Sequence, residues 1–178
     1  MRRFALIFVL LGSVALAQQP RLASKLAPYV VSPSRVVEMM LDMARVKQGD
    51  VLFDLGSGDG RILIAAAERQ AQATGVEINP KLVTAATEEI ARAGLSQRAK
   101  VIQGDVLETD ISAATVVTIY MDTASNAKLR PQLEKYLKPG ARVVSHDYEI
   151  PGWKPVAVQK TEERQPHTIY LYEVGAKK

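Results

Sequence analysis

Residues 54–60, Asp-Leu-Gly-Ser-Gly-Asp-Gly, lie between a short apolar run, residues 51–53, and the alanine-rich segment 61–70. A short apolar run that ends in glycines predicts a buried strand of a parallel sheet, and segment 61–70 has the composition of a helix. Glycines let the main chain turn tightly and let a ligand approach without meeting a side chain. In an open α/β sheet, such a turn borders the crevice where ligands bind. The stretch therefore predicts a ligand-binding turn in an α/β domain.

Outward from this turn, short apolar segments alternate with segments of helical spacing. The predicted strands are residues 51–55, 74–77, 100–103, 115–120, 142–146, 156–160 and 168–174. The predicted helices are residues 33–46, with Ser32 as the N-cap, 61–70, 80–93 and 127–137. This alternation predicts a mostly parallel, seven-stranded sheet with helices on both faces. The last two strands have no room for a helix between them, so one of them is expected to run antiparallel.

The glycine spacing separates this turn from that of a dinucleotide-binding enzyme. Such enzymes carry glycine at the first, third and sixth positions of the turn. Here glycines occupy the first, third and fifth positions, and the sixth is Arg61. Asp59 sits beside the start of the helix, where a carboxylate would repel a phosphate but attract a cationic or zwitterionic ligand. The turn therefore favours a ligand without a pyrophosphate.

Two further acids follow the next two predicted strands. Glu77 ends the second strand, where a carboxylate can accept hydrogen bonds from both ribose hydroxyls. Asp105 follows the third strand, where it could accept a hydrogen bond from an adenine amino group. The alternative is that both are surface acids that cap loops. Three acids after three successive strands, one of them in the glycine turn, favour a nucleoside-binding crevice.

Composition limits the other partners. The chain of 178 residues is long enough for one domain with an ordinary core. It has no cysteine and two histidines, His146 and His167, so a metal site built from these residues is not expected. The formal net charge is +4, and Arg2 and Arg3 of the N-terminal segment contribute to it. Such a small balance gives little support for nucleic-acid binding.

The N-terminus has the features of an export signal. Residues 1–3 are positively charged, residues 4–16 are almost wholly apolar, and residues 15–17, Ala-Leu-Ala, match a signal-peptidase site. The apolar run is shorter than the roughly 20 residues of a transmembrane helix. We expect residues 1–17 to be a signal peptide that exports the protein. The alternatives are an uncleaved membrane anchor, a buried first helix, and a cytoplasmic protein whose signal is not used.

The sequence resembles the class I S-adenosylmethionine (SAM)-dependent methyltransferases, which have a Rossmann-like fold. The resemblance covers a domain of residues 32–175, preceded by an N-terminal arm, residues 18–31. It is stronger for one branch, the non-SET protein-lysine methyltransferases related to the ATP synthase c-subunit lysine methyltransferase. The glycine turn is specific for the superfamily. Features of the branch are residues 29–33, 54–62, 75–78, 119–121, 129–131 and 142–147.

The resemblance implies SAM as the cofactor and a protein lysine as the methyl acceptor. The residues that would bind SAM are Asp54, Gly56, Ser57, Gly58, Asp59, Glu77, Asp105 and Val106. It also implies that the arm near Tyr29 and the loop after Tyr120 close over the methyl group. Val31 and residues 122–123 depart from the branch, in which proline is usual near these positions. The second departure lies where the acceptor would bind.

Methyl transfer to an amine depends mainly on alignment and on a dry site. A lysine must first lose a proton, and an apolar, aromatic channel lowers its pKa by desolvating the ammonium group. Asp122 is expected either to accept a proton from the acceptor or to cap the following helix. His146 is expected to be structural, with substrate contact as the alternative. Candidates for the channel wall, each of which could equally be a core aromatic, are Tyr29, Tyr120, Tyr148 and Trp153. The predicted catalytic residues are Tyr29, Tyr120 and Asp122.

Two other functions stay open at this point. One is a small-molecule N- or O-methyltransferase on the same fold. The other is an exported protein that binds a nucleoside-like ligand and catalyses nothing, which the export signal favours because SAM is made in the cytoplasm. The intact glycine turn and acids favour an enzyme. The chain has little extra sequence for a lid over a small acceptor, which favours a protein substrate, with membrane proteins among the candidates.

Overall fold

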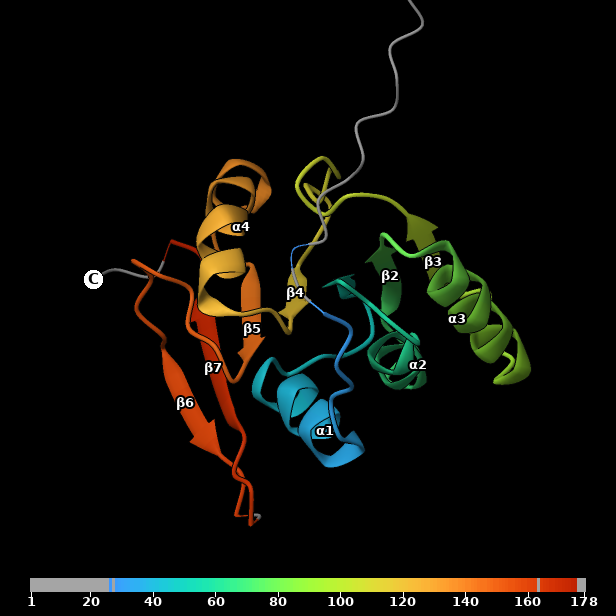
Figure 1. Ribbon diagram of the computed structural model, residues 1–178, viewed down its shortest axis with the longest axis horizontal. Helices are drawn as coiled ribbons and strands as arrows, with labels where there is room; N and C mark the ends of the chain where they lie inside the picture. The colour runs from blue at the N-terminus through green and yellow to red at the C-terminus, as the bar shows by residue number, and fades with distance from the viewer. Residues whose placement is uncertain (1–25, 27, 163, 176–178) are drawn as a thin grey trace, which may run out of the picture.

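The computed structural model describes residues 26, 28–162 and 164–175. This part of the chain contains the helices α1 (Ser34–Met43), α2 (Arg61–Glu68), α3 (Pro80–Arg92) and α4 (Thr123–Tyr136). Its strands are β1 (Val51–Leu55), β2 (Gln72–Glu77), β3 (Ala99–Gln103), β4 (Val116–Ile119), β5 (Arg142–His146), β6 (Ala157–Lys160) and β7 (Thr168–Glu173). Helices connect β1 to β2, β2 to β3 and β4 to β5 (Figure 1). Every predicted strand and helix is present, with shifts of a few residues at the ends.

The seven strands form one sheet in the order β3-β2-β1-β4-β5-β7-β6. Strands β1 to β5 are parallel, whereas β7 pairs antiparallel with both β5 and β6. Strand β3 and the β6–β7 hairpin lie at opposite ends of the sheet (Figure 1). The fold confirms the predicted mostly parallel sheet with one antiparallel strand. The strand order reverses between β1 and β4, which is the point where ligands bind in sheets of this kind.

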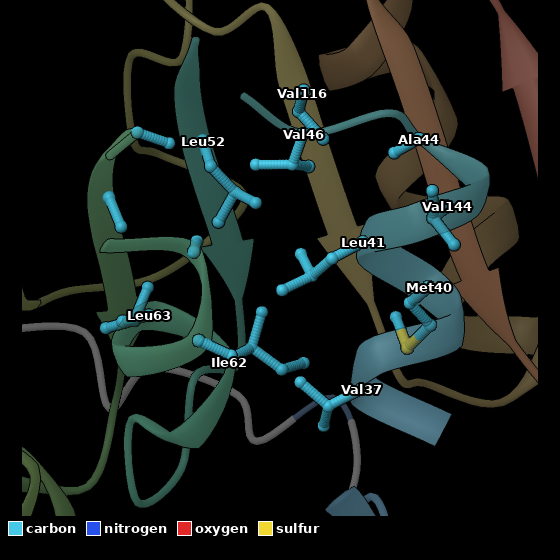
Figure 2. Close-up of a cluster of buried hydrophobic side chains, with 14 of the residues drawn as sticks. Val37, Met40, Leu41, Ala44, Val46, Leu52, Ile62, Leu63, Val116 and Val144 are labelled. Atoms are coloured by element: carbon cyan, nitrogen blue, oxygen red, sulfur yellow. The ribbon is translucent and has the colours of Figure 1, made fainter. Parts of the chain in front are cut away.

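Alternation along the central strands buries both faces of the sheet. Leu52 and Val116 belong to one apolar cluster, which also contains residues of α1 and α2. Their neighbours Phe53 and Val117 belong to a second cluster, which contains residues of α4. Figure 2 shows side chains of α1, including Leu41, directed toward β1 and β4. Helices therefore cover both faces, as predicted, and the carboxyl ends of the parallel strands stay free for a site.

The starts of two helices differ from the sequence prediction. Ser32 was expected to cap α1, but the N-cap is Pro33 and no side chain caps this helix. The Ser32 hydroxyl instead lies 2.9 Å from His146 Nδ1, because a partner at the end of β5 competes for it. Helix α4 begins at Thr123 and not near residue 127, since Asp122 accepts a hydrogen bond from Ser125 N at 2.7 Å and extends the helix by a turn.

A buried polar network closes the opposite, amino end of the strands. The Arg142 guanidinium forms an ion pair with Asp50, which precedes β1, and also donates to the carbonyl of Ala44. Thr115 Oγ1 donates to Asp50 Oδ1 at 2.8 Å, and Lys47 N donates to Asp50 Oδ2 at 3.0 Å. Both oxygens of the carboxylate are therefore satisfied.

The predicted signal peptide or anchor, residues 1–17, lies outside the described residues, as does most of the arm that follows it. Within the described ranges, none of the helices combines the length and the apolar character that crossing a membrane requires.

Candidate active site

The glycine turn after β1 is hydrogen-bonded to the neighbouring strand β2. Gly56 N and Ser57 N both donate to the carbonyl of Val76 in β2, at 2.9 and 3.1 Å. Gly58 has φ +54° and Gly60 has φ +79°, and these left-handed conformations favour glycine. The turn leads directly into α2, whose N-cap is Gly60. The predicted strand–turn–helix context is thus confirmed.

Two glycines also permit close approaches that a side chain would block. A Cβ atom on Gly58 would lie 2.4 Å from Cε2 of Tyr29, so the arm packs directly on the turn. A Cβ atom on Gly75 in β2 would lie 2.4 Å from Ser57 Oγ. Ser57 Oγ is buried and has no hydrogen-bond partner among the described residues. A buried hydroxyl without a partner is rare, and it identifies a place for a polar ligand atom.

A cavity of about 900 Å³, part of it open to solvent, lies at the carboxyl ends of the strands. Its lining includes all the residues predicted to bind SAM, which are Asp54, Gly56, Ser57, Gly58, Asp59, Glu77, Asp105 and Val106. Two of the predicted catalytic residues, Tyr29 and Tyr120, also line it. The structure therefore brings together residues that lie far apart in the sequence.

Glu77, at the end of β2, is buried and held in place by the main chain. Its Oε2 accepts a hydrogen bond from Gly58 N at 3.0 Å, and its Oε1 accepts one from Asn79 N at 2.8 Å. A carboxylate oxygen can accept more than one hydrogen bond, so both oxygens keep capacity for the hydroxyls of a ribose. Asp105 Oδ1 accepts from Leu107 N at 2.9 Å, which fixes this side chain at the other side of the cavity.

Asp54, at the start of the glycine turn, is the most perturbed acid of the cavity. Burial raises its pKa to about 7, although the hydrogen bond that it accepts from Thr118 Oγ1 at 2.7 Å works against this rise. The nearby carboxylates of Asp59 and Glu77 raise the pKa further. A cationic ligand would stabilise the charged form of Asp54, so binding and ionisation are coupled at this site.

The carboxylate of Asp59 is paired with Arg61, so it is less available to a ligand than its position in the sequence suggested. Arg61 donates to both of its oxygens, with Arg61 Nη2 2.6 Å from Asp59 Oδ2, and also donates to the carbonyl of Ser32. Burial raises the pKa of Asp59, but the hydrogen bonds and charge of Arg61 outweigh it, so the pKa lies below its usual value. Asp59 thus ties the turn to the base of the arm, and part of its charge is already compensated.

The aromatic residues expected to form an acceptor channel separate into two groups. Tyr120 follows β4 and stacks on His146, with 3.8 Å between the ring centroids. The ring of Tyr148 also stacks with Tyr120, with 6.3 Å between their centroids. Burial, followed by the charge of Asp147, raises the pKa of Tyr120. Trp153 lies elsewhere, because its ring packs against Tyr172 in the second apolar cluster. Trp153 is therefore a core aromatic, the alternative that the sequence left open for it.

Asp122 does not line the cavity, although it was a predicted catalytic residue. Its carboxylate caps α4, which is the alternative that the sequence left open. Hydrogen bonds from the main chain and side chain of Ser125 lower its pKa.

Sequence reasoning missed the residues that join the arm to β5. Ser32 and Met121 line the cavity, and His146 and His167 meet beside Asp147. A metal site built from the two histidines was not expected from the sequence, because only the register of β5 against β7 places them side by side.

The cavity fits SAM. The unpartnered Ser57 hydroxyl, the glycine turn, and the acids that follow β2 and β3 line one crevice. Asp54 and Glu77 give it the negative character that suits a cationic sulfur. The fold and the site together define a SAM-dependent methyltransferase of the Rossmann-like class.

Comparison with known proteins gives the family. A model described as the ANTKMT methyltransferase domain matches residues 54–157. A protein-lysine N-methyltransferase of Saccharolobus islandicus is 49% identical over 154 residues, which are 85% of this chain and 96% of the relative. The chain therefore belongs to the ANTKMT methyltransferase domain family, which confirms the resemblance drawn from the sequence.

Two further relatives differ in their acceptors. The ATP synthase c-subunit lysine N-methyltransferase of Mus musculus is 33% identical over 89% of this chain, which spans 63% of that relative. The crystal structure of an RNA methyltransferase from Salinibacter ruber, in complex with S-adenosyl-L-homocysteine, is 43% identical, with a TM-score of 0.80. The match covers 84% of this chain and 96% of that structure. Its bound ligand, the demethylated form of SAM, agrees with SAM as the cofactor.

Proposed function

We propose that this chain transfers a methyl group from SAM to a lysine amine of a protein. The observation that carries the proposal is the 49% identity to a protein-lysine N-methyltransferase along nearly its whole length. The cavity supports it, because Tyr29 and Tyr120 line it and supply aromatic rings for an amine channel. Residues 147–156, between β5 and β6, form turns and bends without a helix, so this segment adds no lid that would restrict the acceptor to a small molecule.

Each part of the cavity has a separate task in this reaction. Glu77 and Asp105 hold the ribose and the adenine, and the glycine turn admits the ligand's main body. SAM supplies a methyl group on a positively charged sulfur. Tyr29 and Tyr120 exclude water from the methyl group and lower the pKa of an entering ammonium, so that the neutral amine is available. The protein therefore works mainly by alignment and desolvation.

Asp122 has no direct part in this proposal. It was a candidate for accepting the acceptor's proton, but its carboxylate caps α4 outside the cavity. The lysine proton is instead released to solvent as the channel desolvates the ammonium group.

An RNA acceptor is the second candidate, since the Salinibacter ruber relative is an RNA methyltransferase at 43% identity. The small net charge of +4 is the argument against it, because RNA-binding surfaces are strongly basic. A small-molecule acceptor and a binding protein without catalysis are weaker alternatives. The first would need a lid over the acceptor, and the second does not account for the aromatic wall.

The acceptor can be identified with methyl-labelled SAM. The full chain is incubated with labelled SAM and a cell extract that is separated into protein, RNA and small-molecule fractions. We expect label in a protein band, resistant to nuclease and located on lysine by mass spectrometry. Glu77→Gln serves as the inactive control. Label in RNA or in small molecules would reject the lysine proposal in favour of that acceptor, and binding without transfer would reject catalysis.

We also propose that residues 1–17 direct the domain to the membrane or across it, which would place its substrate among membrane or exported proteins. The charged start, the apolar run and the Ala-Leu-Ala site support this proposal. Fractionation of cells that express the full chain, with N-terminal sequencing of the product, tests it. A cytoplasmic protein that keeps Met1 and the following residues would contradict it.

A further inference from the structure

The two histidines of the chain meet at the carboxyl end of β5, beyond the SAM cavity. His146 ends β5 and is fully buried, Asp147 follows it, and His167 directly precedes β7. His167 Nδ1 lies 2.9 Å from His146 Nε2 and 2.9 Å from Asp147 Oδ2. His146 Nε2 and Asp147 Oδ2 are 3.3 Å apart. Three atoms of metal-ligand type, supplied by the end of β5 and the start of the neighbouring strand β7, therefore lie close together.

Hydrogen bonds alone leave this triangle with an unfavourable contact. If Asp147 accepts hydrogens from both rings, two N–H donors face each other across 2.9 Å. If His146 Nε2 accepts the hydrogen of His167, its lone pair lies 3.3 Å from the Asp147 carboxylate. A cation at the centre of the triangle would accept all three lone pairs and remove both conflicts.

The spacing matches that of ligands around a small divalent ion. Bonds from zinc to imidazole nitrogen or carboxylate oxygen are about 2.0–2.2 Å long. Adjacent ligands around such an ion are then about 2.9 Å apart at right angles and about 3.4 Å apart at tetrahedral angles. The three separations here, 2.9, 2.9 and 3.3 Å, fall in this interval. Very little movement is needed to bind the ion.

Two of the three ligands have hydrogen bonds that leave the ligand atom free for a metal. Ser32 Oγ lies 2.9 Å from His146 Nδ1, which leaves His146 Nε2 free to act as the ligand. Thr168 N donates to Asp147 Oδ1 at 2.8 Å, which leaves Oδ2 for the ion. Asp147 also has φ +60°, a conformation that costs energy for residues other than glycine and is often retained at functional sites.

We propose that His146 Nε2, His167 Nδ1 and Asp147 Oδ2 bind a divalent transition-metal ion of the zinc class. Two imidazoles and one carboxylate are a common ligand set for such ions, with the remaining position left to water. The ion joins β5 to the β6–β7 hairpin. It also buttresses the wall of the SAM cavity, because Tyr120 stacks on His146 and Ser32 contacts its other nitrogen. The proposal does not depend on the identity of the methyl acceptor.

Cobalt titration of the full chain, without a histidine tag, tests the site. Co²⁺ bound by nitrogen and oxygen ligands gives visible absorption that differs from that of free Co²⁺. After treatment with a chelator, we expect one Co²⁺ per chain at micromolar concentration and displacement of the band by Zn²⁺. Asp147→Asn and His167→Ala should each weaken binding at least a hundredfold. Glu88→Gln, which removes an exposed carboxylate on α3, should not change it.

Binding of S-adenosyl-L-homocysteine to each variant shows that the domain is folded. A wild-type chain that gives no band at millimolar Co²⁺ would overturn the proposal, whatever the variants do. So would a folded His167→Ala or Asp147→Asn variant that keeps the band. A second readout is the melting temperature, which Zn²⁺ should raise in the wild type and in Glu88→Gln but not in the two ligand variants.

Discussion

The two ends of the parallel strands are built from the same kinds of residue and serve opposite purposes. At the amino end, Asp50 is paired with both Thr115 and Arg142. At the carboxyl end, within the described part of the chain, Ser57 Oγ is buried without a hydrogen-bond partner and Asp54 is a buried acid without an ion pair. The amino end therefore contributes stability, whereas the carboxyl end keeps unused polar capacity for a ligand.

This difference shows how a small domain separates folding from function. A paired buried charge is costly to disrupt but does nothing else. An unpaired buried acid destabilises the free protein, and a cationic ligand recovers that cost on binding. Substitutions at the amino end should thus change unfolding and not affinity, and those at the carboxyl end should change mainly affinity.

The largest effect is expected for Arg142→Ala at the amino end. The substitution leaves Asp50 as a buried carboxylate without its cation, which costs about 3 kcal/mol, at the lower end of the range for buried pairs. Chemical denaturation should show this loss, and calorimetry should show an unchanged dissociation constant for SAM in the protein that stays folded. A loss of affinity greater than threefold would show that the two ends are not independent.

Glu77→Gln at the carboxyl end should change mainly affinity. The amide keeps the shape of the side chain, but the ribose hydroxyls lose a charged acceptor, and each such hydrogen bond contributes about 1.5–3 kcal/mol. We expect SAM affinity, measured by calorimetry, to fall about a hundredfold. A smaller loss of stability, about 1 kcal/mol, should accompany it, because the amide nitrogen replaces an oxygen that accepts from Gly58 N or Asn79 N. Unchanged affinity would remove Glu77 from the ribose site.

Asp54 makes SAM binding depend on pH. Its pKa is about 7 in the folded, ligand-free protein, and a cationic ligand favours its charged form. SAM should therefore bind up to about tenfold more tightly at pH 8 than at pH 6, the largest change that one linked proton allows over this range. Binding should also release a proton, which calorimetry in buffers of different ionisation enthalpy detects. Asp54→Asn should bind with an affinity that does not change across this range.

The raised pKa of Asp54 also predicts how the stability of the free protein changes with pH. The folded pKa of about 7 lies above the usual value of 3.8 expected for the unfolded chain. Between these values the folded protein holds the extra proton, so the contribution of Asp54 to stability is present below pH 4 and is lost as the pH rises through 7. Asp54→Asn should remove this part of the dependence in denaturation curves. A wild type and variant with parallel curves would contradict the assignment.

Asp122→Ala should have the smallest effect. The loss of a helix N-cap costs about 1 kcal/mol, and the carboxylate lies outside the cavity. We expect a small fall in melting temperature and a rate of methyl transfer within twofold of the wild type. A loss of more than tenfold in kcat, without loss of SAM affinity, would restore Asp122 as a proton acceptor.

The residues predicted to bind SAM could be found from the sequence because the sheet topology determines where they lie. Parallel strands end at one edge of the sheet, so acids that follow successive strands must converge there, as Glu77 and Asp105 do. The acceptor side could not be predicted in the same way. Ser32 meets His146 across 114 positions, and His146 meets His167 only through the register of an antiparallel pair. Local patterns carry no information about such partners, which is why Ser32 was assigned to a helix cap.

The arm that crosses the cavity is main chain fastened at two points. Ser125 Oγ donates to the carbonyl of Leu26 at 2.6 Å, and Arg61 Nη1 donates to the carbonyl of Ser32 at 2.9 Å. Residues 29–31, between these fastenings, have exposed side chains. Tyr29 also packs on Gly58 of the glycine turn, and Ser32 Oγ contacts His146 Nδ1. Movement of the arm away from the cavity would have to break these contacts, whereas the hydrogen bonds between the strands of the sheet would stay intact.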